Sequence, residues 1–179
     1  STVKGVTFDP AGTYLASSGD DPSVCIWRAH DDWGLEKKID SKSGIFRKWN
    51  TGSNGGSSGL SLSSQSLFRR LSWSTDGSYI CATNAVVKNK NVASTISREG
   101  WAVSSAKSTA TGAVNLIGHK QPVVVASHCP YLLDGGSTGA DDDDEPEYAT
   151  LVALGDKRGF VTVWSTRKAR PIFKIQCSQ

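Results

Sequence analysis

Several residue patterns in this sequence have the types and spacings that enzyme chemistry uses. His128 and Cys129 together would supply a base and a nucleophilic thiol, and Gly55-Gly56-Ser57-Ser58-Gly59 matches the Gly-x-Ser-x-Gly pattern of hydrolases. Neighbouring strand residues point to opposite faces, so His128 and Cys129 are not expected to act as a pair. Ser57 lies in a Ser/Gly tract without the strand and helix that flank a hydrolase nucleophile. We therefore expect no enzyme activity, and a hydrolase that uses Ser57 is the enzymatic alternative.

Metal and cofactor chemistry finds little support in the residue spacing. His119 has no cysteine or second histidine at metal-ligand spacing, so we expect it to make a structural hydrogen bond. The cysteines are far apart, without a Cys-x-x-Cys spacing, and this is typical of free thiols in a reducing compartment; they are Cys25, Cys81, Cys129 and Cys177. The longest purely apolar run, Val123 to Ala126, is too short to span a membrane. We expect no metal, no cofactor, no small-molecule substrate and no membrane association.

Two groups of charged residues are candidate partner-binding sites. Arg69 and Arg70 precede Ser72 as in a basic kinase site, but Ser72 falls in an expected strand that a kinase does not reach. The two arginines suit carboxylate recognition at an interface, and a local salt bridge is the alternative. An acidic loop at 134–147 holds the second group, which is Asp141, Asp142, Asp143 and Asp144. These acids suit a basic partner surface, and a solvated loop is the alternative.

A repeated strand–turn–strand unit must position these residues. In the stretch 67–83, apolar and polar residues alternate, a Ser-Thr-Asp-Gly turn follows, and a second apolar run begins. The stretch 6–16 aligns with 71–81, and the alignment places Gly12 over Gly77. An internal repeat of short strands predicts a repeat architecture.

The whole chain divides into units of similar size. It has 179 residues, 37% of them apolar, which is enough for one domain with a modest core. No segment has a helical period, so we expect an all-β chain of four-stranded antiparallel sheets. The expected strands of the first unit are 3–8, 14–17, 23–27 and 35–39. The second unit is expected to open with the strand–turn–strand segment 67–82, followed by strands at 92–97 and 114–117, and the third unit to have strands at 122–127, 149–154, 160–164 and 172–175. The expected divisions are a blade at 1–40, a Gly/Ser-rich insertion at 41–66, a blade at 67–117, and a blade at 118–179 that carries the acidic loop. Ile45, Phe46 and Trp49, near the start of the insertion, are expected to dock on the body.

Three features together resemble the WD40 β-propeller family. Gly118-His119 precedes a strand, Trp27 and Trp164 end strands, and the units repeat at blade-like spacing. The resemblance implies that His119 bonds an aspartate in a tight turn, with a tryptophan packed nearby. It assigns the same structural role to Asp21 and Trp27 in the first unit.

The distance in sequence from the strand-ending tryptophan back to the turn aspartate differs between the first and third units. In the first unit, Asp21 stands six residues before Trp27. The same count back from Trp164 reaches Arg158, and Asp156 stands two residues further back.

A series of segments is similar to the N-terminal propeller of the HIR/HIRA-type histone chaperone subunits. In chain order, they are Val3–Pro10, Asp32–Glu36, Phe68–Ser74, Arg98–Trp101, Gly118–His119 and Arg170–Ile172. The resemblance implies a nuclear scaffold in a complex that deposits histones H3–H4 independently of DNA replication and represses transcription. It implies contact with a ubinuclein-type subunit, with the histones reached indirectly through the complex. Phe68–Ser72 also resembles the propeller subunit of the replication-coupled chromatin assembly factor, which is one alternative, and a generic WD40 adaptor is another.

The number of units predicts an incomplete ring. Propellers of this family have about seven blades, and the chain supplies about three. The chain has no methionine and begins inside an expected strand, so we expect it to be a piece of a longer protein. The predicted fold is therefore an open arc of about three blades with two uncovered flanks, which makes the isolated fragment marginally stable.

Overall fold

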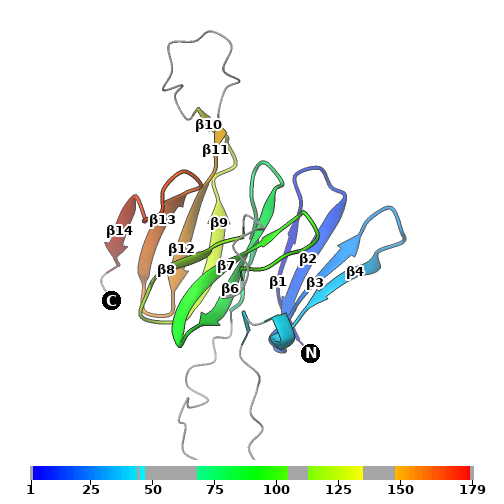
Figure 1. The fold of residues 1–179 in the computed structure, drawn as a ribbon, viewed down its shortest axis with the longest axis horizontal. Helices are drawn as coiled ribbons and strands as arrows, with labels where there is room; N and C mark the ends of the chain where they lie inside the picture. Colours follow the sequence, from blue (N-terminus) through cyan, green and yellow to red (C-terminus); the bar gives the residue numbers. More distant parts are fainter. Residues whose placement is uncertain (1, 44, 47–67, 105–112, 135–147, 178–179) are drawn as a thin grey trace, which may run out of the picture.

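The computed structural model describes residues 2–43, 45–46, 68–104, 113–134 and 148–177. Within these ranges the chain is all-β apart from a 3-10 turn, η1 (Ser41–Ser43), and it forms three four-stranded antiparallel sheets and a two-stranded ribbon. The sheets follow one another as an open arc, which confirms the prediction of a partial propeller (Figure 1). Most of the Gly/Ser-rich insertion, including Ser57, and nearly all of the acidic loop lie outside the described residues. No helix in the described ranges is long and apolar enough to cross a membrane.

The first sheet is a simple meander, because each strand pairs with the next along the chain. Its strands, in order, are β1 (Val3–Phe8), β2 (Tyr14–Gly19), β3 (Val24–Arg28) and β4 (Gly34–Ile39). The turn after β1 is organised by Asp9, whose carboxylate accepts hydrogen bonds from the Thr13 amide and hydroxyl, both at 2.7 Å. Gly12 takes a φ of 70°, a value that favours glycine, and its N–H donates to the Asp9 carbonyl at 3.0 Å.

The second sheet has the same meander, with a shorter first strand than expected. Its strands are β5 (Ser72–Trp73), β6 (Tyr79–Val87), β7 (Lys90–Ser97) and β8 (Asn115–His119). The residues before β5 pair elsewhere: the Arg70 N–H donates to the Val124 carbonyl at 3.1 Å, and the Arg70 carbonyl accepts from the Ala126 N–H at 2.8 Å. The prediction of a strand beginning at residue 67 was therefore wrong, because this segment crosses to the third sheet in a parallel bridge.

The third sheet contains an unpredicted ribbon between its first two strands. The sheet consists of β9 (Val123–His128), β12 (Leu151–Asp156), β13 (Phe160–Ser165) and β14 (Phe173–Gln176). The ribbon pairs β10 (Leu133–Asp134) with β11 (Tyr148–Ala149) in antiparallel register. It projects beyond the ends of the three sheets (Figure 1). The loop predicted to begin at residue 134 therefore starts as a strand.

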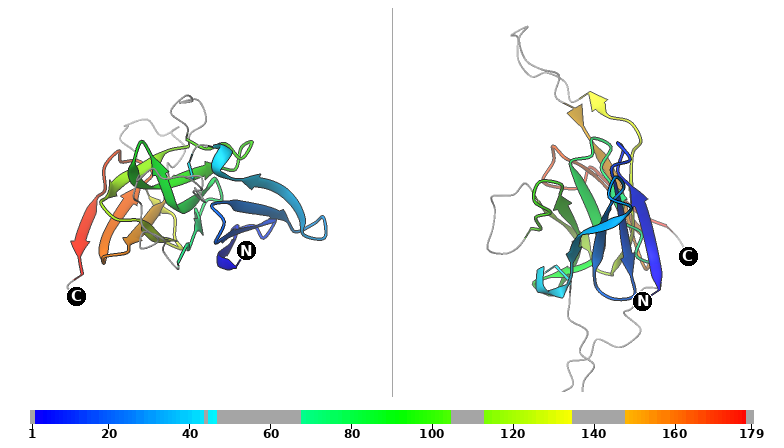
Figure 2. Two further views of the ribbon diagram at one scale, coloured as in Figure 1. Left: turned by 90° about the horizontal axis from the view of Figure 1, so that it is seen from below. Right: turned by 90° about the vertical axis from the view of Figure 1, so that its right-hand side faces the viewer.

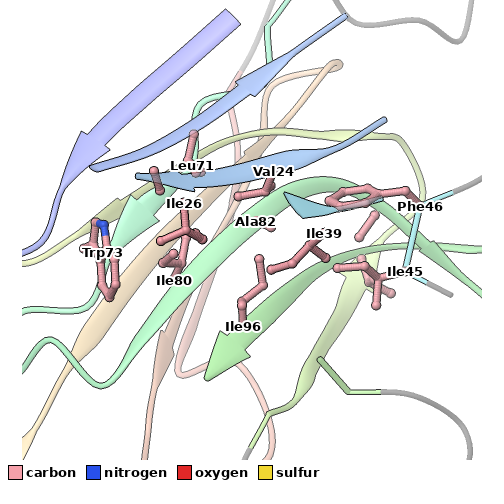
Figure 3. Close-up of a cluster of buried hydrophobic side chains, with 13 residues drawn as sticks. Val24, Ile26, Ile39, Ile45, Phe46, Leu71, Trp73, Ile80, Ala82 and Ile96 are labelled. Carbon is pink, nitrogen blue, oxygen red and sulfur yellow. The ribbon is translucent and has the colours of Figure 1, made fainter. Parts of the chain in front are cut away.

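Two apolar clusters lie between adjacent sheets and hold the arc together. The first lies between the first and second sheets and includes Ile26, Trp73 and Ile80 (Figure 3). Ile45 and Phe46 pack into it, as predicted for the start of the insertion, whereas Trp49 lies outside the described residues. The second cluster lies between the second and third sheets and is formed by Cys81, Ala93, Val123, Ala126, Val152, Leu154 and Trp164. Each fully buried Ile, Leu or Val side chain contributes about 1.5–3 kcal/mol, so these clusters are the main source of stability.

The outer face of each end sheet is apolar and uncovered. On the first sheet, strand register places Phe8, Leu15, Trp27 and Leu35 in one row across all four strands. Phe8 is 60% exposed and Leu35 is 53% exposed. On the third sheet, Phe173 and Ile175 are exposed in the same way. The sheets fan apart in the view from below, with these two faces at the ends of the arc (Figure 2).

Candidate interaction surfaces

A buried hydrogen-bond chain ties the end of β8 to the third sheet. His119 Nδ1 lies 3.1 Å from Asp156 Oδ2, and His119 Nε2 lies 2.8 Å from Thr162 Oγ1. The Trp164 indole N–H donates to the same Thr162 oxygen at 2.8 Å. With the proton on Nδ1, the neutral histidine donates to the aspartate and accepts from the threonine hydroxyl, so every member is satisfied. The structure therefore brings together two predicted structural residues, His119 and Trp164.

The aspartate of the His119 hydrogen-bond chain is Asp156. The residue count back from Trp164, which reached Arg158, was therefore wrong by two positions. Asp156 Oδ1 accepts from the backbone N–H of Arg158 at 2.9 Å and from that of Phe160 at 3.0 Å. The carboxylate thus shapes the turn that ends at Gly159, whose φ is 77°. Arg158 contributes only its backbone N–H to this turn. The turn lengths of the first and third sheets differ, which is why the count from Trp27 does not transfer.

The predicted pair in the first sheet is not joined in the same way. The Trp27 indole N–H donates to Ser17 Oγ at 2.9 Å. The Asp21 carboxylate accepts from the Ser23 hydroxyl at 2.5 Å and lies 3.5 Å from the Lys38 ammonium. These hydrogen bonds of the Asp21 carboxylate and the Trp27 indole lead to two different serines.

Arg69 and Arg70 occupy different environments. The Arg69 guanidinium is partly buried and donates to the Asp21 carbonyl at 3.3 Å. Burial lowers the pKa of Arg69, although the nearby Asp20 and Asp21 charges oppose that change. The Arg70 side chain is exposed, and its guanidinium lies 5.1 Å from the centre of the Phe68 ring. Arg69 therefore helps to join the first two sheets, and Arg70 presents its charge to solvent.

A cation–aromatic clasp, which sequence reasoning did not identify, joins the first and second sheets. Arg98 donates to Asp9 Oδ2 at 3.0 Å and to Thr13 Oγ1 at 2.8 Å. Its guanidinium lies over Tyr14 at 5.1 Å and over Trp73 at 5.8 Å. Burial opposes ionisation of Asp9, but hydrogen bonds from Thr13 and Tyr14 and the Arg98 charge outweigh it, so the pKa of Asp9 is lowered. Only the similarity of the 98–101 segment to a known family marked this region.

Trp101 extends the same clasp. Its ring contacts Tyr14 edge-on, with centroids 5.0 Å apart, and contacts Trp73 at 6.1 Å. Its indole N–H donates to Glu36 Oε1 at 3.4 Å, and Glu36 in turn forms a salt bridge with Arg28. These contacts connect the loop after β7 to β2 and β4, so the two sheets are held at both the core and the loop end.

A second polar chain lies between the second and third sheets. His128 Nδ1 is 3.0 Å from Ser72 Oγ, His128 Nε2 is 3.2 Å from the Tyr79 hydroxyl, and that hydroxyl is 3.1 Å from Thr150 Oγ1. Burial lowers the pKa of His128 to about 4 and raises the pKa of Tyr79 to about 12. Both side chains are therefore neutral at neutral pH.

His128 bonds Ser72 and Tyr79, whereas Cys129 contributes backbone hydrogen bonds, including one from its N–H to the Leu151 carbonyl at 2.9 Å.

The described cysteines and acids form no metal centre. All of Cys25, Cys81, Cys129 and Cys177 are free thiols. Among the described residues, no group of three or more His, Cys, Asp and Glu side chains is placed to hold a metal ion. Burial raises the pKa of the Cys81 thiol to about 12.

Large apolar side chains are exposed in and beside the β10–β11 ribbon, which projects beyond the ends of the sheets (Figure 1). Tyr131 is 72% exposed and Tyr148 is 58% exposed, and Leu132 and Leu133 lie beside them in the chain with 42% and 38% exposure. Asp134 pairs with Tyr148 in the ribbon. We call Tyr131, Leu132, Leu133 and Tyr148 the ribbon surface. The segment that carries Asp141 to Asp144 connects the two ribbon strands and lies outside the described residues.

Over nearly its whole length, the chain is similar to proteins named HIR1 and to a histone transcription regulator. It is 33% identical over 170 residues to protein HIR1 of Mycosarcoma maydis and 34% identical over 176 residues to protein hir1 of Schizosaccharomyces pombe. It is 31% identical over 179 residues to the histone transcription regulator slm9 of Schizosaccharomyces pombe. These matches cover 95%, 98% and 98% of this chain, but only 14%, 15% and 18% of the three relatives. No family model matches the chain.

Proposed function

Because the chain belongs to the HIR type of WD40 propeller, a family of histone regulators, we propose that it is an interaction platform of a nuclear histone-chaperone complex. In this proposal it works by presenting a rigid surface rather than by catalysis. The complex deposits histones H3–H4 independently of replication and represses transcription. The direct partner is a ubinuclein-type subunit, and the histones are reached through the complex.

The observation that carries the proposal is the ribbon surface. Large apolar and aromatic side chains are costly to leave in water, and contiguous exposed groups of them mark protein interfaces. Tyrosine in particular is enriched among the residues that dominate binding energy. Tyr131 and Tyr148 are exposed beyond the strand ends of the third sheet, whose strands are held by two buried polar chains. A rigid support of this kind reduces the entropy lost on binding.

Charged groups add to the surface in this proposal. Asp141, Asp142, Asp143 and Asp144 attract a basic histone surface, which raises the association rate and makes it sensitive to salt. Arg70, which is exposed beside Phe68, provides a second contact for carboxylates. Arg69 supports Arg70 by fixing this segment to the first sheet through the Asp21 carbonyl.

Affinity capture from nuclear extract with the full-length protein tests the proposal. The variant Tyr131→Ser/Tyr148→Ser is compared with Val114→Ser, a matched control because Val114 is also an exposed apolar residue, at 49% exposure. We expect the tyrosine variant to lose complex subunits and H3–H4 while its melting temperature stays at the wild-type value. Equal recovery of these proteins by the variant and the control would refute a role for the ribbon surface. Absence of H3–H4 chaperone subunits from the wild-type capture would refute the proposed function.

A further inference from the structure

A basic hollow lies at the strand ends opposite those that carry the ribbon surface. It has a volume of about 360 Å³ and is lined by Asn89, Lys90 and Asn91 and by the segment 117–120. Strand β9 begins at Val123, shortly after this segment, and ends at His128, which leads toward the ribbon. The segment 117–120 and the ribbon therefore lie at opposite ends of β9, which runs between them in Figure 1.

The walls of the hollow are held in place before any ligand binds. Val87 pairs with Lys90 across a two-residue turn whose central residues, Lys88 and Asn89, have φ values of 48° and 63°. Positive φ at both central positions is the type I′ geometry that matches the twist of a hairpin. On the other wall, the Lys120 carbonyl accepts from the Asn91 side-chain amide at 3.0 Å.

The floor of the hollow is fixed by the His119 hydrogen-bond chain. His119 pairs with Asn91 in the strand register, and its ring is bonded to Asp156 and Thr162 on the third sheet. The backbone on either side of His119 therefore has little freedom to move. A concave site with fixed walls loses little conformational entropy when it binds a ligand.

The charge around the hollow is positive. Lys88, Lys90 and Lys120 are exposed, and the chain has no Asp or Glu in 85–98 or 113–122. The Lys157 N–H donates to the Pro122 carbonyl at 3.1 Å, which brings the exposed Lys157 and Arg158 pair to the same end of the sheets. The acid of that turn, Asp156, is buried against His119, and its carboxylate also accepts hydrogen bonds from the backbone N–H groups of Arg158 and Phe160.

We propose that this hollow binds an acidic peptide segment of a partner protein. Lys90 and Lys120 pair with side-chain carboxylates, and Ile117, which is 51% exposed, contacts an apolar residue between them. Among the described residues, no Phe, Tyr or Trp lines the hollow, and the His119 ring is already bonded to Asp156 and Thr162, whereas proteins that bind single-stranded nucleic acids use aromatic stacking platforms. This site is separate from the ribbon surface and does not depend on the proposed function.

Fluorescence anisotropy with the full-length protein and labelled octaglutamate tests the site. The variant Lys90→Glu/Lys120→Glu is compared with Lys168→Glu/Lys174→Glu, which makes the same charge change at exposed lysines near β14. We expect the first variant to bind octaglutamate roughly tenfold more weakly and the control to stay within about twofold of wild type. The reason is that only the first variant loses lysines that pair closely with the carboxylates of the peptide. The milder Lys90→Gln/Lys120→Gln variant is expected to fall between them.

Two further measurements complete the test. A labelled DNA duplex of the same charge is titrated in parallel, and the melting temperature of every variant is recorded. Loss of peptide affinity in Lys90→Gln/Lys120→Gln without a change in melting temperature supports the site. The proposal is overturned if wild type does not bind octaglutamate, if the two Glu variants weaken it equally, or if DNA binding falls more than peptide binding.

Discussion

Replacement of Arg98 by methionine removes the clasp between the first and second sheets while keeping most of its side-chain volume. Loss of one partner from a fully buried ion pair costs about 3–5 kcal/mol. The Arg98 side chain is 35% exposed, so solvent screening lowers this cost. The cost is lowered further because Asp9 keeps its hydrogen bonds from Thr13 and Tyr14. Two cation–π contacts add about 0.5–1 kcal/mol each. We expect the free energy of unfolding to fall by about 3 kcal/mol.

Urea unfolding of the full-length protein, followed by tryptophan fluorescence, measures this loss, since Trp73 and Trp101 lie beside Arg98. Asp9→Asn and the double variant Arg98→Met/Asp9→Asn complete a mutant cycle. We expect the double variant to lose less than the sum of the two single losses, because both remove the same ion pair. A coupling energy below about 0.5 kcal/mol would show that the pair does not hold the sheets together.

Acidification tests the same pair through the pKa of Asp9. That pKa is lowered in the folded protein from its ordinary value of 3.8. Its ionisation therefore contributes its full stability above pH 3.8, and the contribution is lost as the pH falls through the lower, folded value. Without Arg98 the pKa of Asp9 in the folded protein moves back up, because the Arg98 charge no longer opposes the effect of burial. We expect Arg98→Met to lose less stability than wild type on acidification, and an identical loss would contradict the assignment.

Three other changes test separate contacts. His119→Ala leaves the buried Asp156 carboxylate without its ring partner and is expected to lower the free energy of unfolding by about 2–3 kcal/mol in urea; unchanged stability would contradict this. Gly5→Ala places a methyl group against the Arg69 backbone carbonyl and is expected to lower the free energy of unfolding by about 1–3 kcal/mol, measured as faster limited proteolysis. Gly12→Ala is the comparison, because its methyl group lies in open space and only backbone strain remains. Cys81 is expected to react with iodoacetamide at pH 8 far more slowly than the exposed Cys177, by mass spectrometry, because burial raises the pKa of the Cys81 thiol to about 12; equal labelling would refute this.

The strands of the first sheet were predictable because their sequence carries a local signal. Alternating apolar residues and turn residues set the bounds of β1 to β4 to within two residues. The β10–β11 ribbon gave no such signal, because each of its strands has only two residues and a period needs more. The crossing at Arg70 was also missed, because the same alternation suits a strand in either sheet.

The contacts between sheets were less predictable than the strands. His119 and Trp164 were named in advance from their spacing, but Asp156 was displaced by the length of its turn. The partnership of Arg98 with Asp9 joins residues 89 positions apart and leaves no periodic trace in the chain. Such pairings follow from how sheets stack, which local propensity does not encode.

From the meander topology we expect this chain to fold in two stages. Every strand of the first sheet pairs with its sequence neighbour, so the sheet closes only short loops. The Arg98 clasp instead connects distant segments, and its contacts form once two finished sheets meet. Contacts that form late change the unfolding rate more than the folding rate. Loss of the clasp is therefore expected to raise the unfolding rate and shorten the lifetime of the assembled arc. The rate at which each sheet forms is expected to stay nearly unchanged.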